Sequence, residues 1–306
     1  MRAVTRNRIG RPSERFFTKR QCIAAAVIAI LGATLSCAPD PPNPLETIGF
    51  EYRVIPNLTY RTVGGWTGRL DLYVRPDGRN KPTLFWIHGG GWTAGSKEED
   101  ALFFLPYLAD GWSVASVEYR LAAAAAAPAA VEDCRCALAW LLQNAARYGV
   151  SAERVVISGI SAGGHLALTT AGLYGSDARE CRVPIGFKPA AVINWYGPSD
   201  LSELAFGDDP FDQAVEWMSG QRELARSLSP LRHVSASAPP VLTIHGNADD
   251  VIPYSQSVRL HKALSKAGVA NQLLTIEGAH HGDFTAEQIA RAYGAVRSFL
   301  RAYATR

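Results

Sequence analysis

Cysteine and charge are both scarce in this sequence. Five of its 306 residues are cysteine, and 19% are charged. Two of the cysteines, Cys22 and Cys37, lie near the N-terminus. Cys134 and Cys136 stand too close together on a helical pattern to bridge each other, so at most one of them pairs with Cys181. The sequence therefore predicts neither a disulfide framework nor a zinc site, while its 47% of hydrophobic residues are enough for one large core.

Seven of the basic residues gather in the first twenty positions. The formal net charge is +3, with 31 basic and 28 acidic residues. Leaving out residues 1–36 removes seven basic residues and one acidic residue, so 24 face 27 and the net charge becomes −3. A mildly acidic body offers no electrostatic footprint for a polyanion, which excludes nucleic acid as a partner.

A hydrophobic run long enough to cross a bilayer comfortably is also missing. The run from Cys22 to Leu35 follows a basic segment and suits a secretory signal. We expect residues 1–38 to be an export signal, processed either at a lipobox-like TLSC, which makes Cys37 a lipidated membrane tether, or after Ala38. The upstream SERFFTK resembles a twin-arginine signal in which glutamate replaces one arginine, and an uncleaved anchor is the alternative. The expected location is a bacterial envelope, with the protein periplasmic, secreted or lipid-anchored.

Short apolar runs alternate with helical stretches through the rest of the chain. TLFWIH, SVASVEY, RVVISG, AAVINWYG, PVLTIHG and QLLTIEG lack polar alternation, as strands buried on both faces should. Helical patterns that end at glycine stand between them, and YRTV and RLDLYVRP predict an opening antiparallel pair. The sequence thus predicts an α/β fold, with a mostly parallel central sheet flanked by helices, in a single domain over residues 39–306. Residues 200–238 depart from this rhythm and form either a lid or a surface insertion.

Three consecutive glycines follow the first buried run, in WIHGGGWTAGSK from Trp86 to Lys97. A phosphate-binding loop is excluded because the serine and lysine stand in the reverse of the required order. Gly89, Gly91 and Ala94 fit a dinucleotide fingerprint after a strand. An oxidoreductase remains a weak alternative, because no clear helix start and no ribose-binding acid at the expected distance accompany that fingerprint.

A second glycine motif, GISAG from Gly159 to Gly163, lies between a buried strand and a small-residue helix, the context of a nucleophile elbow. The flanking glycines leave room for a sharp turn that projects the Ser161 hydroxyl at the carboxyl edge of the sheet. A serine hydroxyl needs a base near neutral pH, and the base needs an acid that holds its tautomer. Both follow downstream, with Asp249 in the loop after one buried strand and His280 and His281 after the next.

With these motifs the chain resembles an α/β-hydrolase of the esterase/lipase branch that carries an H-G-G-G motif. The resemblance extends over nearly all of residues 49–300. It implies a triad of Ser161, Asp249 and His281, because the family's H-G-x-x-D-x-x-V/I-P segment carries the acid and the family's histidine stands directly before a glycine. The neighbouring alternatives to the last two residues are Asp250 and His280.

The resemblance also gives the glycine run a role. It implies that the backbone amides of Gly90 and Gly91 join that of Ala162 to bind the oxyanion of a tetrahedral intermediate, without a metal or cofactor. His88 and His245 each precede a glycine at a strand end. We expect both to be structural, with the imidazole holding a loop through hydrogen bonds.

The implied reaction is hydrolysis of a small-molecule carboxylic ester, with a short-chain acyl or an aryl group, through an acyl-enzyme. Ile160 points to the branch of exported acetyl, feruloyl and arylformamide-type hydrolases. Trp92 is either a wall of the substrate pocket or a core aromatic. The run Ala122–Ala127 replaces the proline, glutamate and aromatic of many relatives, which predicts a smoother, wider wall or a loosely held loop. The alternatives are an arylformamidase or amidase on the same triad and a non-catalytic binding protein on a hydrolase fold.

Overall fold

A computed structural model describes residues 51–76, 81–172 and 181–304 of the chain. The predicted export signal, residues 1–38, lies outside these described residues. Within them, no helix combines the length and the apolar character that crossing a membrane requires.

The described residues form one eight-stranded sheet with the order β1-β2-β4-β3-β5-β6-β7-β8. β1 pairs antiparallel with β2 and β2 antiparallel with β4, whereas every pair from β4 to β8 is parallel. The central strands are buried along their whole length, which explains why their sequences lack polar alternation. The predicted antiparallel opening and parallel body are confirmed. The strands are β1 (Arg53–Val63), β2 (Trp66–Val74), β3 (Thr83–Ile87), β4 (Ser113–Val117), β5 (Val155–Ile160), β6 (Ala191–Trp195), β7 (Val241–Gly246) and β8 (Asn271–Ile276).

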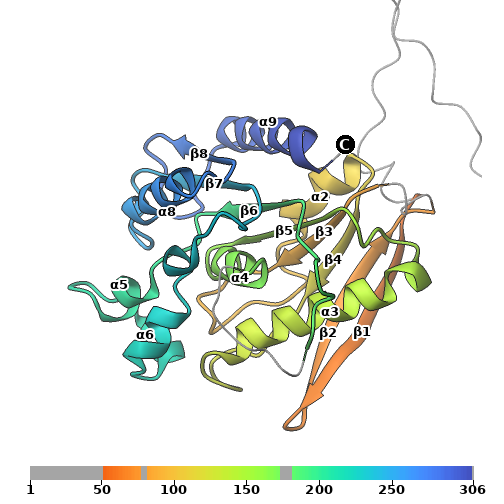
Figure 1. The fold of residues 1–306 in the computed structure, drawn as a ribbon, viewed down its shortest axis with the longest axis horizontal. Coiled ribbons are helices and arrows are strands. Elements are labelled where there is room, and N and C mark those ends of the chain that lie inside the picture. The colour runs from red at the N-terminus through yellow and green to blue at the C-terminus, as the bar shows by residue number, and fades with distance from the viewer. Residues whose placement is uncertain (1–50, 77–80, 173–180, 305–306) are drawn as a thin grey trace, which may run out of the picture. The chain divides into compact units, whose positions relative to one another are not determined.

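Helices cover both faces of the sheet (Figure 1). The hydrophobic core on one face joins the sheet to α3 (Ala129–Tyr148), α4 (Ala162–Thr170) and α8 (Tyr254–Lys266). The core on the other face joins it to α2 (Ala101–Ala109) and α9 (Ala286–Tyr303). This two-core arrangement is the α/β-hydrolase architecture that the sequence predicted.

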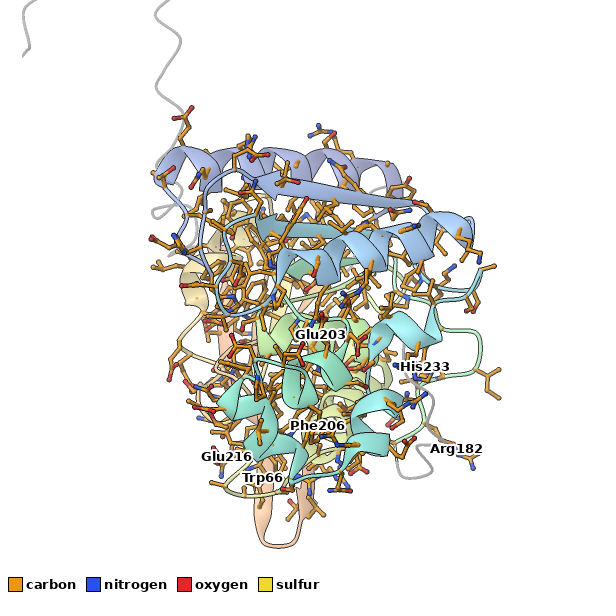
Figure 2. All side chains as sticks on the ribbon, turned by 90° about the vertical axis from the view of Figure 1, so that its left-hand side faces the viewer. Trp66, Arg182, Glu203, Phe206, Glu216 and His233 are labelled. Atoms are coloured by element: carbon orange, nitrogen blue, oxygen red, sulfur yellow. A yellow bond between two sulfur atoms is a disulfide. The ribbon has the colours of Figure 1, made fainter. Side chains whose placement is uncertain are left out.

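The excursion predicted over residues 200–238 contains three short helices and a 3₁₀ turn between β6 and β7, and it faces the viewer in Figure 2. Its base is held by Gln256 of α8, whose side-chain oxygen accepts from the amides of Ser199 at 2.9 Å and Asp200 at 3.0 Å. An ion pair between Glu203 and Arg259 adds a second link to α8. The segment is therefore fastened to the body near the carboxyl edge of the sheet. Its elements are α5 (Leu201–Phe206), α6 (Asp212–Met218), α7 (Arg222–Ser227) and η2 (Pro230–His233).

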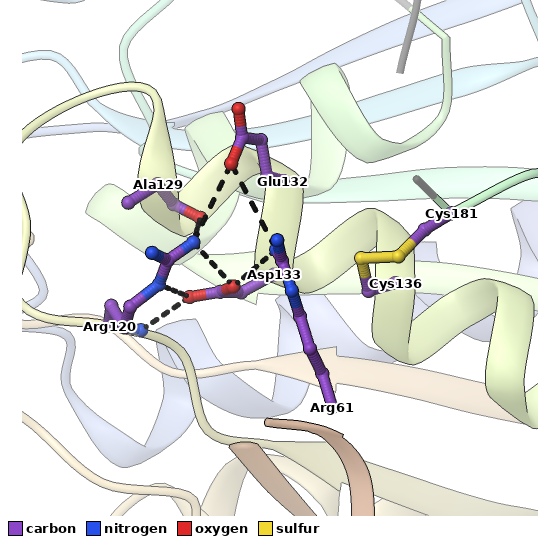
Figure 3. Close-up of a disulfide and its surroundings, with 7 residues drawn as sticks. All are labelled: Arg61, Arg120, Ala129, Glu132, Asp133, Cys136 and Cys181. Carbon is purple, nitrogen blue, oxygen red and sulfur yellow. Dashed lines mark hydrogen bonds and ion pairs between the residues drawn. A yellow bond between two sulfur atoms is a disulfide. The ribbon is translucent and has the colours of Figure 1, made fainter. Parts of the chain in front are cut away.

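A disulfide joins Cys136 of α3 to Cys181 (Figure 3). Cys134 is a buried free thiol. The two α3 cysteines stand two positions apart on the helix and so point in different directions. The prediction that at most one of them pairs with Cys181 is confirmed, and Cys136 is the one that does.

Beside the disulfide, a buried carboxylate fixes the start of α3 (Figure 3). Asp133 Oδ2 accepts from the backbone amide of Arg120 at 3.0 Å and from its Nε at 2.7 Å, and Asp133 Oδ1 accepts from Arg61 Nη1 at 3.0 Å. Its side chain has no exposed surface. These contacts tie the loop after β4 to α3 and to β1.

The alanine run is neither a helix nor a loosely held loop. Residues 122–124 form a turn between β4 and α3, where the amides of Ala124 and Ala125 donate to the carbonyl of Leu121. The run is attached at both ends, because the amide of Ala122 donates to Trp92 O at 2.9 Å and that of Ala127 donates to Trp217 O at 3.0 Å. The expectation of a loosely held loop is therefore wrong. Backbone hydrogen bonds hold the loop although its side chains are only methyl groups.

Candidate active site

The turn between β5 and α4 presents Ser161 at the carboxyl edge of the sheet. Its backbone has φ 51°, a value that costs a residue with a side chain some strain, and its amide donates to Trp195 O at 2.9 Å. A Cβ on Gly159 would lie 2.4 Å from Gly163 O, and one on Gly163 would lie 2.2 Å from Ile87 O. Both flanking positions therefore require glycine, as the motif predicted.

A hydrogen-bonded chain runs from this serine to a carboxylate. His281 Nε2 lies 2.8 Å from Ser161 Oγ, and His281 Nδ1 lies 2.8 Å from Asp249 Oδ2. An ionised carboxylate only accepts, so Nδ1 carries the proton and Nε2 presents its lone pair to the serine hydroxyl. The three predicted residues are thus in direct contact, in the arrangement that lets a histidine act as a base.

The side chain of Asp249 is completely buried and is turned inward by its own loop. The amides of Val251 and Ile252 donate to Asp249 Oδ1 at 2.9 and 2.8 Å. Burial by itself raises the pKa of this carboxyl, but hydrogen bonds from His245, His281 and Ile252 outweigh burial and hold the pKa far below its ordinary value. Asp249 is consequently an anion next to His281.

The two neighbouring alternatives lie at the surface. His280 Nδ1 is 3.6 Å from Asp250 Oδ2, and the two side chains are 59% and 69% exposed. His280 and Asp250 thus pair with each other at the surface, whereas His281 is hydrogen-bonded to the buried side chain of Asp249. An exposed pair of this kind contributes little to stability or orientation. The geometry thus favours Asp249 and His281 over these neighbours.

The three-glycine loop leaves β3 and packs directly against the serine turn. A Cβ on Gly163 would lie 2.4 Å from His88 O, and one on Gly89 would lie 3.0 Å from Ile160 Cγ1. Gly90 has φ 104° and Gly91 has φ 60°, so both have backbone conformations that favour glycine. A Cβ on Gly90 would also lie 2.2 Å from Ala94 O.

Three backbone amides at this junction are open to a ligand. Within the described part of the chain, the amides of Gly90, Gly91 and Ala162 make no hydrogen bond. The amide of Gly89 differs, because it donates to Asp100 Oδ2 at 3.1 Å and so fixes the loop. Ala162 is the first residue of α4, where the helix dipole also favours negative charge. These amides are the donors that the sequence predicted for an oxyanion.

His88 stabilises the glycine loop from within the core. Its ring stacks on Tyr119 with 4.2 Å between the ring centroids, and its Nδ1 donates to Gly89 O at 2.8 Å. The Tyr119 hydroxyl donates to the carbonyls of His88 and Gly89 at 3.1 and 3.2 Å. Burial lowers the pKa of His88 to about 4, so the ring stays neutral. The position fits the structural role that the sequence favoured.

Trp92 follows the glycines but presents almost no surface to a substrate. It is 1% exposed and stacks on Trp217 of α6, with centroids 4.7 Å apart and planes within 2°. The ring of His165 packs edge-on against both indoles. Of the two interpretations of Trp92, the core aromatic describes these contacts. The residues that lie against Gly91 come instead from the excursion, where Phe211 and Gln213 approach it.

Sequence reasoning missed two further residues at the site. Tyr196 has φ 40°, and its ring meets the His281 imidazole edge-on at 4.8 Å. His245 was expected only to hold a loop, yet its Nε2 lies 3.1 Å from Asp249 Oδ2. A signal for Tyr196 exists in the sequence, because it directly follows a buried strand at the same sheet edge as Ser161.

The described residues include no group of three or more histidine, cysteine, aspartate or glutamate side chains arranged for a metal ion.

Comparisons with known proteins identify similar esterases. Residues 70–264 match the sequence model of the BD-FAE family. Esterase LipQ of Mycobacterium tuberculosis is 31% identical to this chain over 234 residues. The aligned part covers 71% of this chain and 55% of LipQ. An ethyl acetate hydrolase of Pseudomonas putida is 30% identical to this chain, and the aligned part covers 74% of each protein. The chain spans about half the length of the mycobacterial esterases that it matches.

A solved structure gives the same result for the fold. Esterase Est2 of the planctomycete Thermogutta terrifontis, with butyrate bound, superimposes with a TM-score of 0.67 at 28% identity. The match covers 84% of this chain and 95% of that esterase. The similarity therefore extends over most of this chain and nearly all of that esterase.

Proposed function

The chain belongs to the BD-FAE family, an esterase-like family of α/β-hydrolases, and on that premise we propose that it is a serine hydrolase of carboxylic esters. One observation carries the proposal. His281 Nε2 lies 2.8 Å from Ser161 Oγ while its Nδ1 donates to a buried anionic carboxylate. This arrangement activates a serine hydroxyl that is otherwise a poor nucleophile.

The proposed reaction has two halves. In the first, His281 Nε2 takes the proton of Ser161, Oγ attacks the ester carbonyl carbon, and the carbonyl oxygen becomes an oxyanion. The carbon–oxygen bond of the alcohol then breaks, and the alcohol leaves with the proton held by His281. In the second half, a water molecule loses a proton to His281 and attacks the acyl-enzyme. The acid departs and Ser161 regains its proton.

Two groups of atoms in the site match the charges that this reaction creates. The Asp249 carboxylate faces the imidazolium that forms on His281. The amides of Gly90, Gly91 and Ala162 stand where the oxyanion develops, and such preorganised donors each contribute about 10²–10³ in rate. The glycines are retained there because a Cβ would collide with neighbouring backbone or with the excursion.

A short acyl group or an aryl ester is the proposed substrate class. Phe211 and Gln213 of the excursion lie against Gly91, where a Cβ would come within 2.9 Å of Gln213 Cβ. We expect these two side chains to limit the room beside the oxyanion loop for a long acyl chain. The relatives that act on ethyl acetate or hold butyrate are consistent with this class.

Substrate profiling tests the proposal. Purified protein is expected to hydrolyse p-nitrophenyl acetate and butyrate with a kcat/KM at least about tenfold above that for the octanoate, because each methylene that a pocket rejects costs roughly 1–3 kcal/mol. An aryl formamide in the same assay separates an esterase from an arylformamidase. The blank is the same preparation inactivated with a fluorophosphonate. Turnover of the formamide alone, or a rate that rises with chain length, contradicts the proposal.

We propose further that the protein is exported and processed near residue 38. The disulfide between Cys136 and Cys181 supports an oxidising compartment, because such bonds are rare in the bacterial cytosol. Expression in a bacterial host followed by N-terminal mass analysis is expected to give a chain beginning at Cys37 with added lipid, or at Pro39 without it. A cytosolic chain that retains residue 1 contradicts export.

A further inference from the structure

A second histidine, with no part in the proposed reaction, holds the Asp249 carboxylate. His245 is the penultimate residue of β7 and is fully buried. Its Nε2 lies 3.1 Å from Asp249 Oδ2 and 3.0 Å from the carbonyl oxygen of Ile252. Both of these oxygens accept, so the Nε2 of His245 carries a proton and donates.

The other ring nitrogen of His245 has its own partner on α8. Nδ1 lies 2.6 Å from the hydroxyl oxygen of Ser257, which is itself buried. A neutral ring with its proton on Nε2 offers a lone pair at Nδ1, and the serine hydroxyl donates to it. The titratable groups that face this ring are Asp249, from the loop after β7, and Tyr254 of α8, whose ring packs edge-on at 5.6 Å. Ser257 thus selects the nitrogen that faces Asp249.

With His245 in place, all four lone-pair positions of the Asp249 carboxylate are occupied. Oδ1 accepts from the amides of Val251 and Ile252, and Oδ2 accepts from His281 Nδ1 and His245 Nε2. The carboxylate cannot rotate without breaking at least one of these bonds. Its Oδ2 therefore stays directed at the histidine that contacts Ser161.

We propose that His245, oriented by Ser257, is a positioning residue that fixes the Asp249 carboxylate and limits how much of its charge acts on His281. The inference rests on the proposed serine-hydrolase function. Without the His245 donor, Oδ2 keeps a single partner and the carboxylate gains freedom to rotate, which lowers the rate of attack. At the same time more negative charge falls on His281, which stabilises its protonated, inactive form. The acid limb of the pH–rate profile then moves to higher pH.

The experiment compares full-length wild type with His245→Ala, His245→Gln and Ser257→Ala. The glutamine amide nitrogen reaches the position of Nε2 and keeps a donor. The matched control is His261→Gln, a buried histidine of α8 that bonds to Asn271 and does not contact the triad. Three quantities are measured from pH 5 to 9: the second-order rate of Ser161 labelling by a fluorophosphonate, and kcat and KM for p-nitrophenyl butyrate.

His245→Ala is expected to lower both the labelling rate and kcat by about 10–100-fold, the range expected when a hydrogen bond to a charged group is lost. KM stays unchanged and the acid limb moves to higher pH. His245→Gln keeps most of the rate, Ser257→Ala is intermediate, and His261→Gln matches wild type. A His245→Ala protein with wild-type labelling rate and acid limb overturns the proposal.

Two complications have defined outcomes. If both His245 variants melt well below wild type, Ser257→Ala decides the question, because it leaves the imidazole in place; wild-type kinetics in that variant overturn the proposal. If wild type is labelled at Ser161 but hydrolyses no ester, the proposed ester hydrolysis fails. The labelling rates of the same set of variants then still confirm or overturn the role of His245.

Discussion

Replacing Ser161 by alanine is expected to lower kcat for p-nitrophenyl butyrate by about 10⁶-fold, the scale found when a triad nucleophile is removed. The change deletes the atom that attacks the carbonyl and leaves His281 with no proton to take. Alanine keeps the Cβ that the turn already accommodates, so the melting temperature is expected to stay near that of wild type. Steady-state kinetics and a thermal melt on the same preparation measure both quantities.

Ser158→Ala is the matched control for this variant. Ser158 lies three residues earlier on β5, is fully buried and does not contact His281. It is expected to retain wild-type kcat. A Ser161→Ala protein that keeps a substantial share of wild-type hydrolysis would show that another group performs the attack.

Asp249→Asn is expected to lower kcat by about 10⁴-fold with little change in KM. The backbone amides of Val251 and Ile252 can only donate, so they require an oxygen where Oδ1 now lies. The amide NH₂ of asparagine must then take the place of Oδ2 and face His281 Nδ1. That forces the His281 proton onto Nε2, where the lone pair is needed to accept the proton of Ser161.

Asp250→Asn controls for the loss of one negative charge from this loop. Its side chain is 69% exposed and pairs only loosely with His280. We expect kcat within the range of wild type for this variant. A large loss in Asp250→Asn combined with a small loss in Asp249→Asn would transfer the role of the acid to the neighbouring residue.

The fold was predictable where burial alone determines the sequence pattern. Runs such as TLFWIH lack polar alternation because both faces of the sheet are covered, so each parallel strand was found from its composition. The strand order was not predictable, because the position of β4 between β2 and β3 depends on pairing across distant parts of the chain. The pairing of Cys136 rather than Cys134 depends on which face α3 turns to the segment that carries Cys181.

The candidate site was predictable where a motif restricts the backbone. The GISAG turn and the glycine run mark positions with no room for a side chain, and the structure locates those collisions at Gly90, Gly159 and Gly163. The choice between Asp249 and Asp250 depends on a loop whose amides draw one carboxylate inward, a geometry that adjacent aspartates in a sequence do not reveal.

Contacts between side chains from separate elements were the hardest to foresee. Trp92 stacks on Trp217 of the excursion, and no periodic pattern links these two positions. His245 reaches Asp249 because the loop after β7 folds back on its own strand. Both were treated as isolated residues in the sequence, and their partners follow only from tertiary packing.

The most direct test of the central claim is to locate the group that a fluorophosphonate modifies. The protein is treated until ester hydrolysis stops, digested, and its peptides are analysed by mass spectrometry. A single phosphonylated residue, Ser161, in a proportion that matches the lost activity, is the predicted result. Full modification of Ser161 with hydrolysis intact, or loss of hydrolysis with the label on another residue, would contradict the account.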